Sequence, residues 1–493
     1  MDHVDVIVVG AGISGIGAGY HLQDKSPDRS YMILEGRADM GGTWDLFRYP
    51  GIRSDSDMYT LGYIFEPWTE AKAIADGPNI LNYVKRTAAK YGIDKHIRFN
   101  HHVKAASWST EDARWTVTAV TEGREVQYSC NFLFMCSGYY NYAKGHLPDF
   151  AGTEEFGGQI IHPQFWPEDL DYAGKKVVVI GSGTAVTIVP EMAKAAAQVT
   201  MLQRSPTYVV SRPSEDALAN KLRNMLPSKL AYALVRWRNV LFGMYFFNAA
   251  RKHPAQAKER VLAMLGEHLP AETIEQHFTP RYNVWDQRLC LVPDADLFGA
   301  IKAGKAAVVT DTIDRFDANG IVLHSGARLD ADIVVTATGL ELQLLSDVAF
   351  SVDGDARDLA KTYNYKGMMY SDMPNLASSF GYTNASWTLK ADLTCSYVCR
   401  LLNTMKKRGM RQVTPRIEGD LQPAPFLDFT SGYVTRAMER FPKQGNKQPW
   451  QVHQNYVKDL AALRFGSVDD EMEFSNPAPR TMAGAARRER VSA

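Results

Sequence analysis

The sequence predicts an α/β protein with two Rossmann-like dinucleotide-binding domains, the second of which carries a helical insertion. Two glycine-rich turns support this prediction, Gly10-Ala-Gly12-Ile-Ser-Gly15 and Gly181-Ser-Gly183. Each turn follows an apolar run typical of a buried parallel strand, and each precedes a helical pattern. The chain of 493 residues is long enough for about three domains.

The composition is that of an ordinary globular protein. Hydrophobic residues make up 45% of the chain, and 55 Lys and Arg balance 55 Asp and Glu. This balance gives no electrostatic reason to expect nucleic acid as a partner. The five cysteines are few and odd in number, which favours a reducing, cytoplasmic setting over a disulfide framework. No apolar run reaches the roughly 18 residues of a membrane span, and we expect no metal site.

The first domain begins with the strand Val4 to Val9, and the turn after it has the features of a dinucleotide loop. Gly10, Gly12 and Gly15 permit a tight turn, close approach to a pyrophosphate and close packing of the helix on the strand. The helix N-terminus offers positive partial charge to the phosphates. Glu35 closes the second strand, Tyr31 to Leu34, and stands 20 residues after Gly15, where such folds place the acid that binds a ribose hydroxyl. A carboxylate there would repel a 2′-phosphate, so this domain favours FAD or NAD.

The second domain follows the same plan with the opposite charge. The strand Lys176 to Ile180 leads into its glycine turn, and the strand Val199 to Gln203 ends at Arg204 and Ser205. An arginine at this place suits the 2′-phosphate of NADPH, through a charge-assisted bond worth about 1.5–3 kcal/mol. The alternative interpretation of Arg204 is a solvated surface charge.

The second turn departs from the usual pattern at its third small residue. That position holds Val186, while Ala185 stands one residue earlier, as if a residue before Thr184 had been deleted. The branched side chain would hold helix and strand apart. Either the turn is remodelled so that Ala185 makes the close contact, or NADPH docking is weakened.

The remaining segments suggest how the domains are divided. Residues 215–277 are mainly helical and are expected to cap the active site; their mixture of apolar and basic residues leaves weak binding to a membrane surface as a lesser possibility. The segment 444–456, with Trp450, either covers the cofactor site or packs as a C-terminal segment. We expect an FAD-binding domain at 1–143, an NADP-binding domain at 144–213, the insertion at 214–277, the second NADP part at 278–339, the returning FAD part at 340–475 and a disordered tail at 476–493.

Three further segments are too rich in functional side chains for plain loops. Residues 41–62 combine glycines with Trp, Tyr, Arg and Asp, and residues 278–293 contain three aromatics and two arginines. Between the glycine turns lies Phe156-x-Gly158-x3-His162-x3-Trp166, which could act as a hinge. The alternative is a buried linker whose His and Trp merely pack.

These segments resemble the Baeyer–Villiger monooxygenases, class B flavoproteins that insert an oxygen atom beside a carbonyl, and especially their mycobacterial ethionamide-activating subgroup. The resemblance covers nearly the whole chain and rests on the hinge signature, GGTWDLFRYPGIRSDSDMYTLG, WDQRLCLVP and GYTNASWTLK. It implies FAD and NADPH as cofactors. The FAD contacts implied on this chain are Gly10, Gly12, Ser14, Gly15, Glu35, Thr43, Trp44, Asp45, Leu46, Asp55 and Val103. The NADP contacts are Arg53, Ser54, Gly181, Ser182, Gly183, Thr184, Ala185, Arg204 and Ser205.

The resemblance also implies a reaction. NADPH reduces FAD, the reduced flavin captures O2 as a C4a-peroxide, and attack on a ketone gives an ester or lactone. Arg288 is the expected catalytic cation, because a guanidinium stays charged and can stabilise the peroxide and the alkoxide, and Asp55 is expected to hold it. The same chemistry extends to organosulfur substrates such as sulfides and thioamides. The alternatives are a flavin N- or S-monooxygenase without ketone activity, or a flavoprotein that only binds its cofactors; a disulfide reductase would need a cysteine pair.

Overall fold

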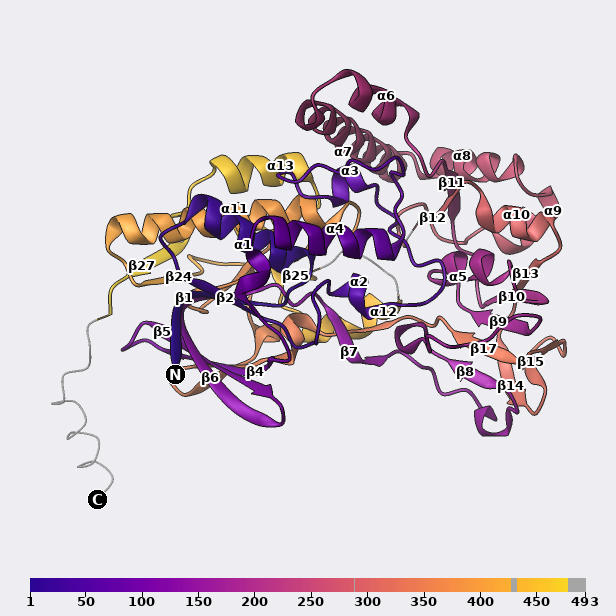
Figure 1. The fold of residues 1–493 in the computed structure, drawn as a ribbon, viewed down its shortest axis with the longest axis horizontal. Helices are drawn as coiled ribbons and strands as arrows, with labels where there is room; N and C mark the ends of the chain where they lie inside the picture. Colours follow the sequence, from indigo (N-terminus) through magenta and orange to yellow (C-terminus); the bar gives the residue numbers. More distant parts are fainter. Residues whose placement is uncertain (288, 427–431, 478–493) are drawn as a thin grey trace.

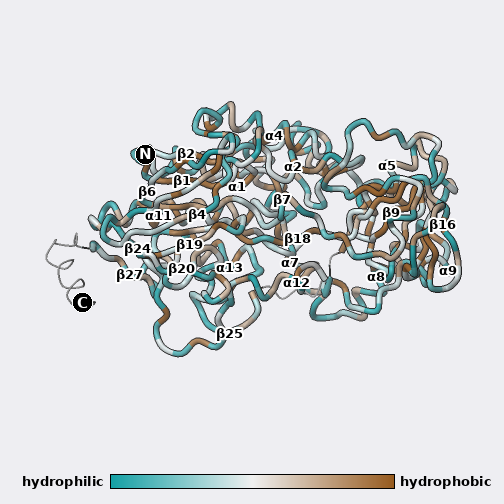
Figure 2. Tube along the Cα trace, turned by 90° about the horizontal axis from the view of Figure 1, so that it is seen from below, coloured by the Kyte–Doolittle hydropathy of each residue, from teal (hydrophilic) through white to brown (hydrophobic). Residues whose placement is uncertain are grey.

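The computed structural model describes residues 1–287, 289–426 and 432–477, and two sheets organise it (Figure 1). The first sheet lies toward the N-terminus and the second lies beside it, with helices above both. Figure 2 shows hydrophobic residues concentrated along the strands of both sheets. All five cysteines are free and buried.

The first sheet has nine strands within the described residues and combines a parallel centre with an antiparallel meander. Val6, Ile7 and Val8 are fully buried, as expected for a central strand covered on both faces. The sheet runs in the order β20 (Asp355–Arg357), β19 (Ala349–Val352), β4 (His102–Ser109), β5 (Arg114–Thr121), β6 (Arg124–Met135), β1 (Asp2–Val9), β2 (Tyr31–Leu34) and β3 (Ile97–Arg98), while β23 (Leu376–Ser378) pairs with β6.

One strand differs from the sequence-based expectation. The sequence pattern predicts two strands here, at residues 125–129 and 132–136, but β6 is continuous from Arg124 to Met135. It pairs with β5 from Arg124 to Cys130 and with β1 from Tyr128 to Met135, so β1 holds the strand extended on both sides of the polar Asn131. The strand therefore joins the antiparallel meander to the parallel centre of the sheet.

The second sheet is parallel throughout, and its strands come from residues 159–336. Its order is β13 (Ala306–Thr310), β10 (Gln198–Gln203), β9 (Lys176–Ile180), β17 (Ile333–Thr336) and β8 (Gln159–Ile161). Two short strands connect the sheets, since β7 (Tyr140–Gly145) pairs antiparallel with β18 (Leu340–Leu342). The chain therefore leaves the first sheet and returns to it through paired segments.

The predicted insertion is helical, as expected. It consists of α6 (Ala217–Met225), α7 (Ser228–Lys252), α8 (Pro254–Gly266) and α9 (Ala271–His277). Figure 1 shows α6 and α7 along the upper edge of the molecule, outside α3 (Met58–Leu61). Among the helices of the described residues, none combines the length and the apolar character needed to cross a bilayer.

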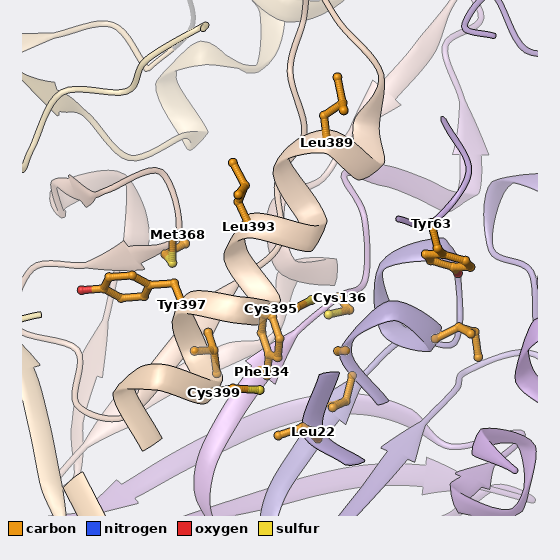
Figure 3. Close-up of a cluster of buried hydrophobic side chains, with 14 of the residues drawn as sticks. Leu22, Tyr63, Phe134, Cys136, Met368, Leu389, Leu393, Cys395, Tyr397 and Cys399 are labelled. Carbon is orange, nitrogen blue, oxygen red and sulfur yellow. The ribbon is translucent and has the colours of Figure 1, made fainter. Parts of the chain in front are cut away.

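The returning part of the chain completes the core of the first sheet. The long helix α11 (Trp387–Arg408) packs against α1 (Ile13–Lys25). Figure 3 shows this core, where α11 supplies Leu389, Leu393, Cys395, Tyr397 and Cys399 and faces Leu22, Phe134 and Cys136.

The remaining elements are short or lie at the periphery. They include α2 (Thr43–Leu46), α4 (Gly77–Lys90), α5 (Ala185–Met192), α10 (Asp296–Lys302), α12 (Gly432–Ala437), α13 (Tyr456–Leu460), β11 (Val209–Arg212), β12 (Cys290–Pro293), β14 (Ile313–Asp317), β15 (Gly320–Leu323), β16 (Arg328–Asp330), β21 (Asn364–Tyr365), β22 (Met369–Tyr370), β24 (Gln412–Pro415), β25 (Pro423–Ala424), β26 (Gln444–Gly445) and β27 (Met472–Ser475). Most of the predicted tail, residues 478–493, lies outside the described residues.

Candidate cofactor and active site

A single cavity of about 1980 Å³ opens onto the glycine turns of both sheets. Most of the predicted site residues line it. They are Gly10, Gly12, Ser14, Glu35, Thr43, Trp44, Arg53, Ser54, Asp55, Val103, His162, Gly181, Ser182, Gly183, Thr184, Arg204 and Ser205. The tertiary structure therefore brings residues nearly 200 positions apart to one space.

Other predicted residues do not line this cavity. They are Gly15, Asp45, Leu46, Ala185, Phe156, Gly158 and Trp166. Four of them, Gly15, Asp45, Leu46 and Ala185, are predicted cofactor contacts that the cavity lining does not support, whereas the other three belong to the hinge signature. Arg288 lies outside the described residues, although its neighbours Gln287 and Leu289 line the cavity.

The first turn needs its glycines for backbone contacts. Gly10 has a φ of +102°, and a Cβ built on Gly15 would lie 1.8 Å from the Gly10 carbonyl oxygen. Gly15 thus lets α1 pack directly on the turn. Gly12 faces Gly42, whose own φ is +58°, and a Cβ on Gly42 would lie 3.1 Å from the Gly12 Cα. These two glycines keep the cavity open at the N-terminus of α1.

Glu35 is positioned at the end of β2 by the same turn. Its Oε2 accepts a hydrogen bond from the Ala11 amide at 2.7 Å, and its Oε1 accepts one from the Arg37 amide at 2.9 Å. Burial is the main cause that raises the pKa of Glu35. Each carboxylate oxygen keeps lone-pair capacity, so Glu35 can still accept a ribose hydroxyl.

Asp45 stands behind the cavity wall and holds two arginines. Its Oδ2 accepts hydrogen bonds from Arg37 Nη2 at 2.8 Å and Nε at 3.0 Å, and its Oδ1 accepts one from Arg48 Nη2 at 2.7 Å. The carboxylate is only 3% exposed. Asp45 therefore positions the loop of residues 36–48 and does not face the cavity.

The returning helix α11 also contributes to the first site. Trp387 donates a hydrogen bond from Nε1 to Ser14 Oγ at 2.7 Å, and Ser379 donates one to the same oxygen at 3.1 Å. Trp387 lines the cavity. Sequence reasoning did not assign Trp387 to this site, because its contact with Ser14 joins residues 373 positions apart.

The second turn is built differently from the first. Helix α5 begins at Ala185, two residues after Gly183, whereas α1 begins directly after Gly12. Thr184 has helical angles, and the Val186 amide donates to the Gly183 carbonyl at 3.3 Å. Ala185 and Val186 are both buried in the core. This later helix start supports a remodelled turn around Ala185.

Two arginines meet beyond this turn. A Cβ built on Gly432 would lie 3.4 Å from Arg436 Nη1 and 4.0 Å from Arg204 Nη2, and all three residues line the cavity. Burial and then the nearby charge of Arg204 lower the pKa of Arg436. Arg436 comes from the returning segment and belongs to no motif, so no sequence pattern joins it to Arg204.

The loop after α2 reaches the second sheet. A Cβ on Gly51 would lie 2.7 Å from the Thr187 carbonyl oxygen of α5. Arg53 forms an ion pair with Asp296 of α10 through Nη1 at 2.5 Å. Arg53 thus lines the cavity while its guanidinium group is paired with Asp296. This ion pair holds the loop against the second half of the molecule.

His162 of the hinge signature braces the two connecting segments. Its Nε2 lies 3.2 Å from the Gly339 carbonyl oxygen, and its Nδ1 accepts a hydrogen bond from the Gln164 amide. Gln164 donates to the Asn141 and Tyr142 carbonyl groups on the other connection. Burial lowers the pKa of His162, which favours the neutral ring that these bonds require.

The rest of the hinge signature supports the second half only. Phe156 packs against Phe316 at 6.0 Å between ring centroids, and a Cβ on Gly158 would lie 2.3 Å from the Asp332 carbonyl oxygen. Trp166 packs partly buried against the core of the second sheet. His162 differs from these three, because it contacts a connecting segment through Gly339.

The segment before Arg288 is strained where it meets the cavity. Trp285 has a φ of +73°, a conformation that costs a residue of this kind about 1–3 kcal/mol and is concentrated at functional sites. Its ring packs edge-on against Phe247 of α7. Trp285 and Phe247 line the cavity together with Asp55. Within the segment 444–456, Trp450 is fully buried and donates a hydrogen bond to Glu471, whereas Gln454, Asn455 and Tyr456 line the cavity.

The geometry fits one dinucleotide in each half. In the described structure no side chain caps the N-terminus of α1 or of α5, so both ends direct amide groups at a cavity-lining glycine turn. A buried carboxylate follows the first turn, which suits a ribose without a 2′-phosphate. Two arginines follow the second, which suits a 2′-phosphate.

Known proteins resemble both halves of this arrangement. Residues 74–347 match the flavin-binding monooxygenase-like family model, and residues 8–69 match the NAD(P)-binding Rossmann-like domain model. The FAD-containing monooxygenase EthA of Mycobacterium tuberculosis is 56% identical over 484 residues, which cover 97% of this chain and 99% of that protein. An open crystal structure of cyclohexanone monooxygenase has a TM-score of 0.74 at 18% identity, covering 97% of this chain and 100% of that one. OTEMO in complex with FAD and NADP has a TM-score of 0.72 at 20% identity, covering 96% and 99%.

Sequence, fold and site geometry agree with these similarities. The chain therefore belongs to the flavin-binding monooxygenase-like family and is a class B, FAD-containing flavoprotein monooxygenase.

Proposed function

We propose that this chain is an NADPH-consuming Baeyer–Villiger monooxygenase that converts ketones to esters or lactones and also oxidises sulfides or thioamides. The observation that carries the proposal is the single cavity that joins a turn suited to FAD, a turn suited to NADPH and the strained segment next to Arg288. Electron transfer between two cofactors needs such a shared space.

The chain's own residues divide the binding between the two halves. Gly10, Gly12 and Glu35 would hold FAD, while Gly181 and the Arg204–Arg436 pair would hold NADPH. The chemistry that FAD supplies when bound is acceptance of a hydride and transfer of one oxygen atom from O2. The Arg53–Asp296 pair joins the two halves directly, and His162 braces the connecting segment at Gly339.

The cavity walls support an apolar substrate. Phe242, Phe246, Phe247, Trp285 and Tyr456 line the cavity near the insertion. Aromatic walls bind an alkyl or aryl group by excluding water from it. Arg288 is proposed to stabilise the negative oxygen that forms on the substrate carbonyl, and Asp55 to position Arg288. A fixed cation in a site that excludes water acts strongly on such a charge.

The test is incubation of the FAD-loaded protein with NADPH, O2 and either an aliphatic methyl ketone or methyl phenyl sulfide. We expect an ester from the ketone and a sulfoxide from the sulfide. Formation of sulfoxide without ester would indicate an S-monooxygenase instead. The absence of both products would overturn the proposal. Arg288→Ala should lower the rate of ester formation by about 10² to 10³ while NADPH still reduces the flavin.

A further inference from the structure

The outward side of α6 and α7 is unusually apolar for a surface. We name it the docking face, which consists of Leu218, Met225, Leu230, Leu234, Trp237, Leu241, Phe242 and Tyr245, each between 41% and 70% exposed. On α7 the spacing of residues 230, 234, 237, 241 and 245 forms one stripe along the helix. The inward side of α7 is also apolar, with Ala231, Val235 and Val240 buried. A helix that is apolar on both sides is expected to be covered on both.

The charge of this region has one sign. Residues 217–252 contain seven Lys and Arg but no Asp or Glu, although the whole chain carries equal numbers of both kinds. Arg238 pairs with Asp216 and Arg251 with Asp286. Lys221, Lys229 and Lys252 are exposed, and within the described residues no ion pair engages them. The docking face is therefore flanked by lysines that an anionic partner can neutralise.

We propose that the docking face binds the surface of an anionic lipid bilayer. Apolar side chains would enter the boundary between headgroups and acyl chains while the lysines stay at the phosphates. Trp237 and Tyr245 belong to the residue types that are enriched at this boundary. A second copy of the chain fits less well, because a symmetric contact would bring the same cations together. Binding is to the surface only, since no described helix can span a bilayer.

The position of the docking face gives this binding a consequence that rests on the proposed function. Leu218 and Phe242 belong to the docking face and also line the cavity. Docking would therefore place the cavity entrance against the lipid. An apolar ketone or sulfide dissolved in the bilayer would reach the cavity without crossing water.

The experiment is flotation of the full-length, FAD-loaded protein with vesicles, which does not depend on any catalytic activity. One set of vesicles contains equal parts of phosphatidylglycerol and phosphatidylcholine, and the other contains phosphatidylcholine alone. The test variant is Leu230→Glu/Leu234→Glu/Leu241→Glu, whose three residues do not line the cavity. The control variant, Ile64→Glu/Leu147→Glu/Phe165→Glu, makes the same charge change at residues that are 50–57% exposed elsewhere.

We expect the wild type and the control variant to float with the anionic vesicles. The test variant should bind them at least about tenfold more weakly, because it loses buried apolar area and adds repulsion. The wild type and the control variant should bind the neutral vesicles more weakly than the anionic ones. Equal binding by test and control variants, or no flotation of the wild type, would overturn the proposal. If the wild type does not bind vesicles but self-associates, and the test variant abolishes this self-association, the docking face binds a second copy of the chain instead.

Discussion

At the scale of single residues, Arg204 and Arg436 are the clearest determinants of cofactor choice. Two guanidinium groups that lie near one point are mutually unfavourable unless an anion joins them. The lowered pKa of Arg436 has this repulsion as its second cause after burial. A 2′-phosphate would turn the repulsion into two charge-assisted bonds.

Removing either arginine should therefore weaken NADPH more than NADH. We expect Arg204→Ala and Arg436→Ala each to raise the Kd for NADP⁺ by about 10 to 100-fold, as one charge-assisted bond implies. Direct binding by calorimetry measures this without turnover. Arg440→Ala is the control, since Arg440 lies on the same segment but faces Glu341 at 3.9 Å. Equal weakening of NADH would indicate that the arginines only maintain the fold.

At the scale of elements, the two glycine turns make different demands on their helices. Gly15 allows α1 to touch the Gly10 carbonyl group, whereas no described atom lies within 4 Å of a Cβ built on Gly183. The closest packing thus occurs in the first turn. In the second turn, the later start of α5 removes the need for such close packing of the helix on the turn.

This difference predicts that an added methyl group destabilises the first turn much more than the second. Gly15→Ala should lower the free energy of unfolding by about 3 kcal/mol and release FAD, because its Cβ overlaps a backbone oxygen. Gly183→Ala should change the stability by less than about 1 kcal/mol. Chemical denaturation and the flavin absorbance of the purified proteins test both. Equal losses in the two variants would contradict the distinction.

A buried arginine, Arg236, helps to attach helix α7 to the first half. Arg236 is 4% exposed and donates from Nη1 to the Tyr59 and Gly62 carbonyl groups, each at 2.8 Å, while Nη2 lies 3.6 Å from Asp392. Without Arg236, α7 would cover these carbonyl groups at the end of α3 and leave them without this hydrogen-bond donor. The cation therefore fixes the insertion over the cavity.

Replacing Arg236 should release this attachment. Arg236→Ala removes the donor to the buried carbonyl groups and the cation beside Asp392, so we expect a loss of about 3–5 kcal/mol in the free energy of unfolding. Hydrogen exchange should show faster exchange in α3 and α7 than in β9. Arg238→Ala is the matched control on the same helix, since Arg238 is 38% exposed and its pair with Asp216 contributes about 1 kcal/mol or less. Unchanged exchange in α7 after Arg236→Ala would refute this role.

At the scale of the whole molecule, several histidines share one response to pH. Burial is the first cause that lowers the pKa of His102, His146, His162, His277 and His453. The unfolded chain takes up protons at these sites near pH 6.5, while the folded chain does so only at lower pH. Their contribution to stability is therefore complete above about pH 6.5 and is lost as the pH falls below it.

Acidification from pH 7.5 to about 5.5 should accordingly lower the Tm. Scanning calorimetry across this range measures the effect, and His277→Gln should flatten part of the slope. A Tm that rises on acidification would have the wrong sign for these five groups. Carboxylates with lowered pKa values, such as Asp5 and Asp216, act at more acidic pH and leave this window unaffected.

The sequence by itself determined the local units and the family. Strands such as Tyr31 to Leu34 and Lys176 to Ile180 have the predicted bounds, because apolar runs between turns specify buried strands through short-range preferences. The charges of Glu35 and Arg204 at the strand ends are likewise local features, and they distinguish the predicted FAD site from the predicted NADPH site. The break expected within β6 was wrong, because pairing with β1 on both sides of Asn131 overrode the local pattern.

Only the tertiary structure decided which of these residues share a site. The meeting of Arg204 with Arg436, and of Ser14 with Trp387, depends on a chain that leaves the first sheet and returns to it. The burial of Asp45 behind its arginines and the withdrawal of Gly15 from the cavity are likewise results of packing. The physical reason is that such contacts join residues hundreds of positions apart, and no spacing within one segment encodes them.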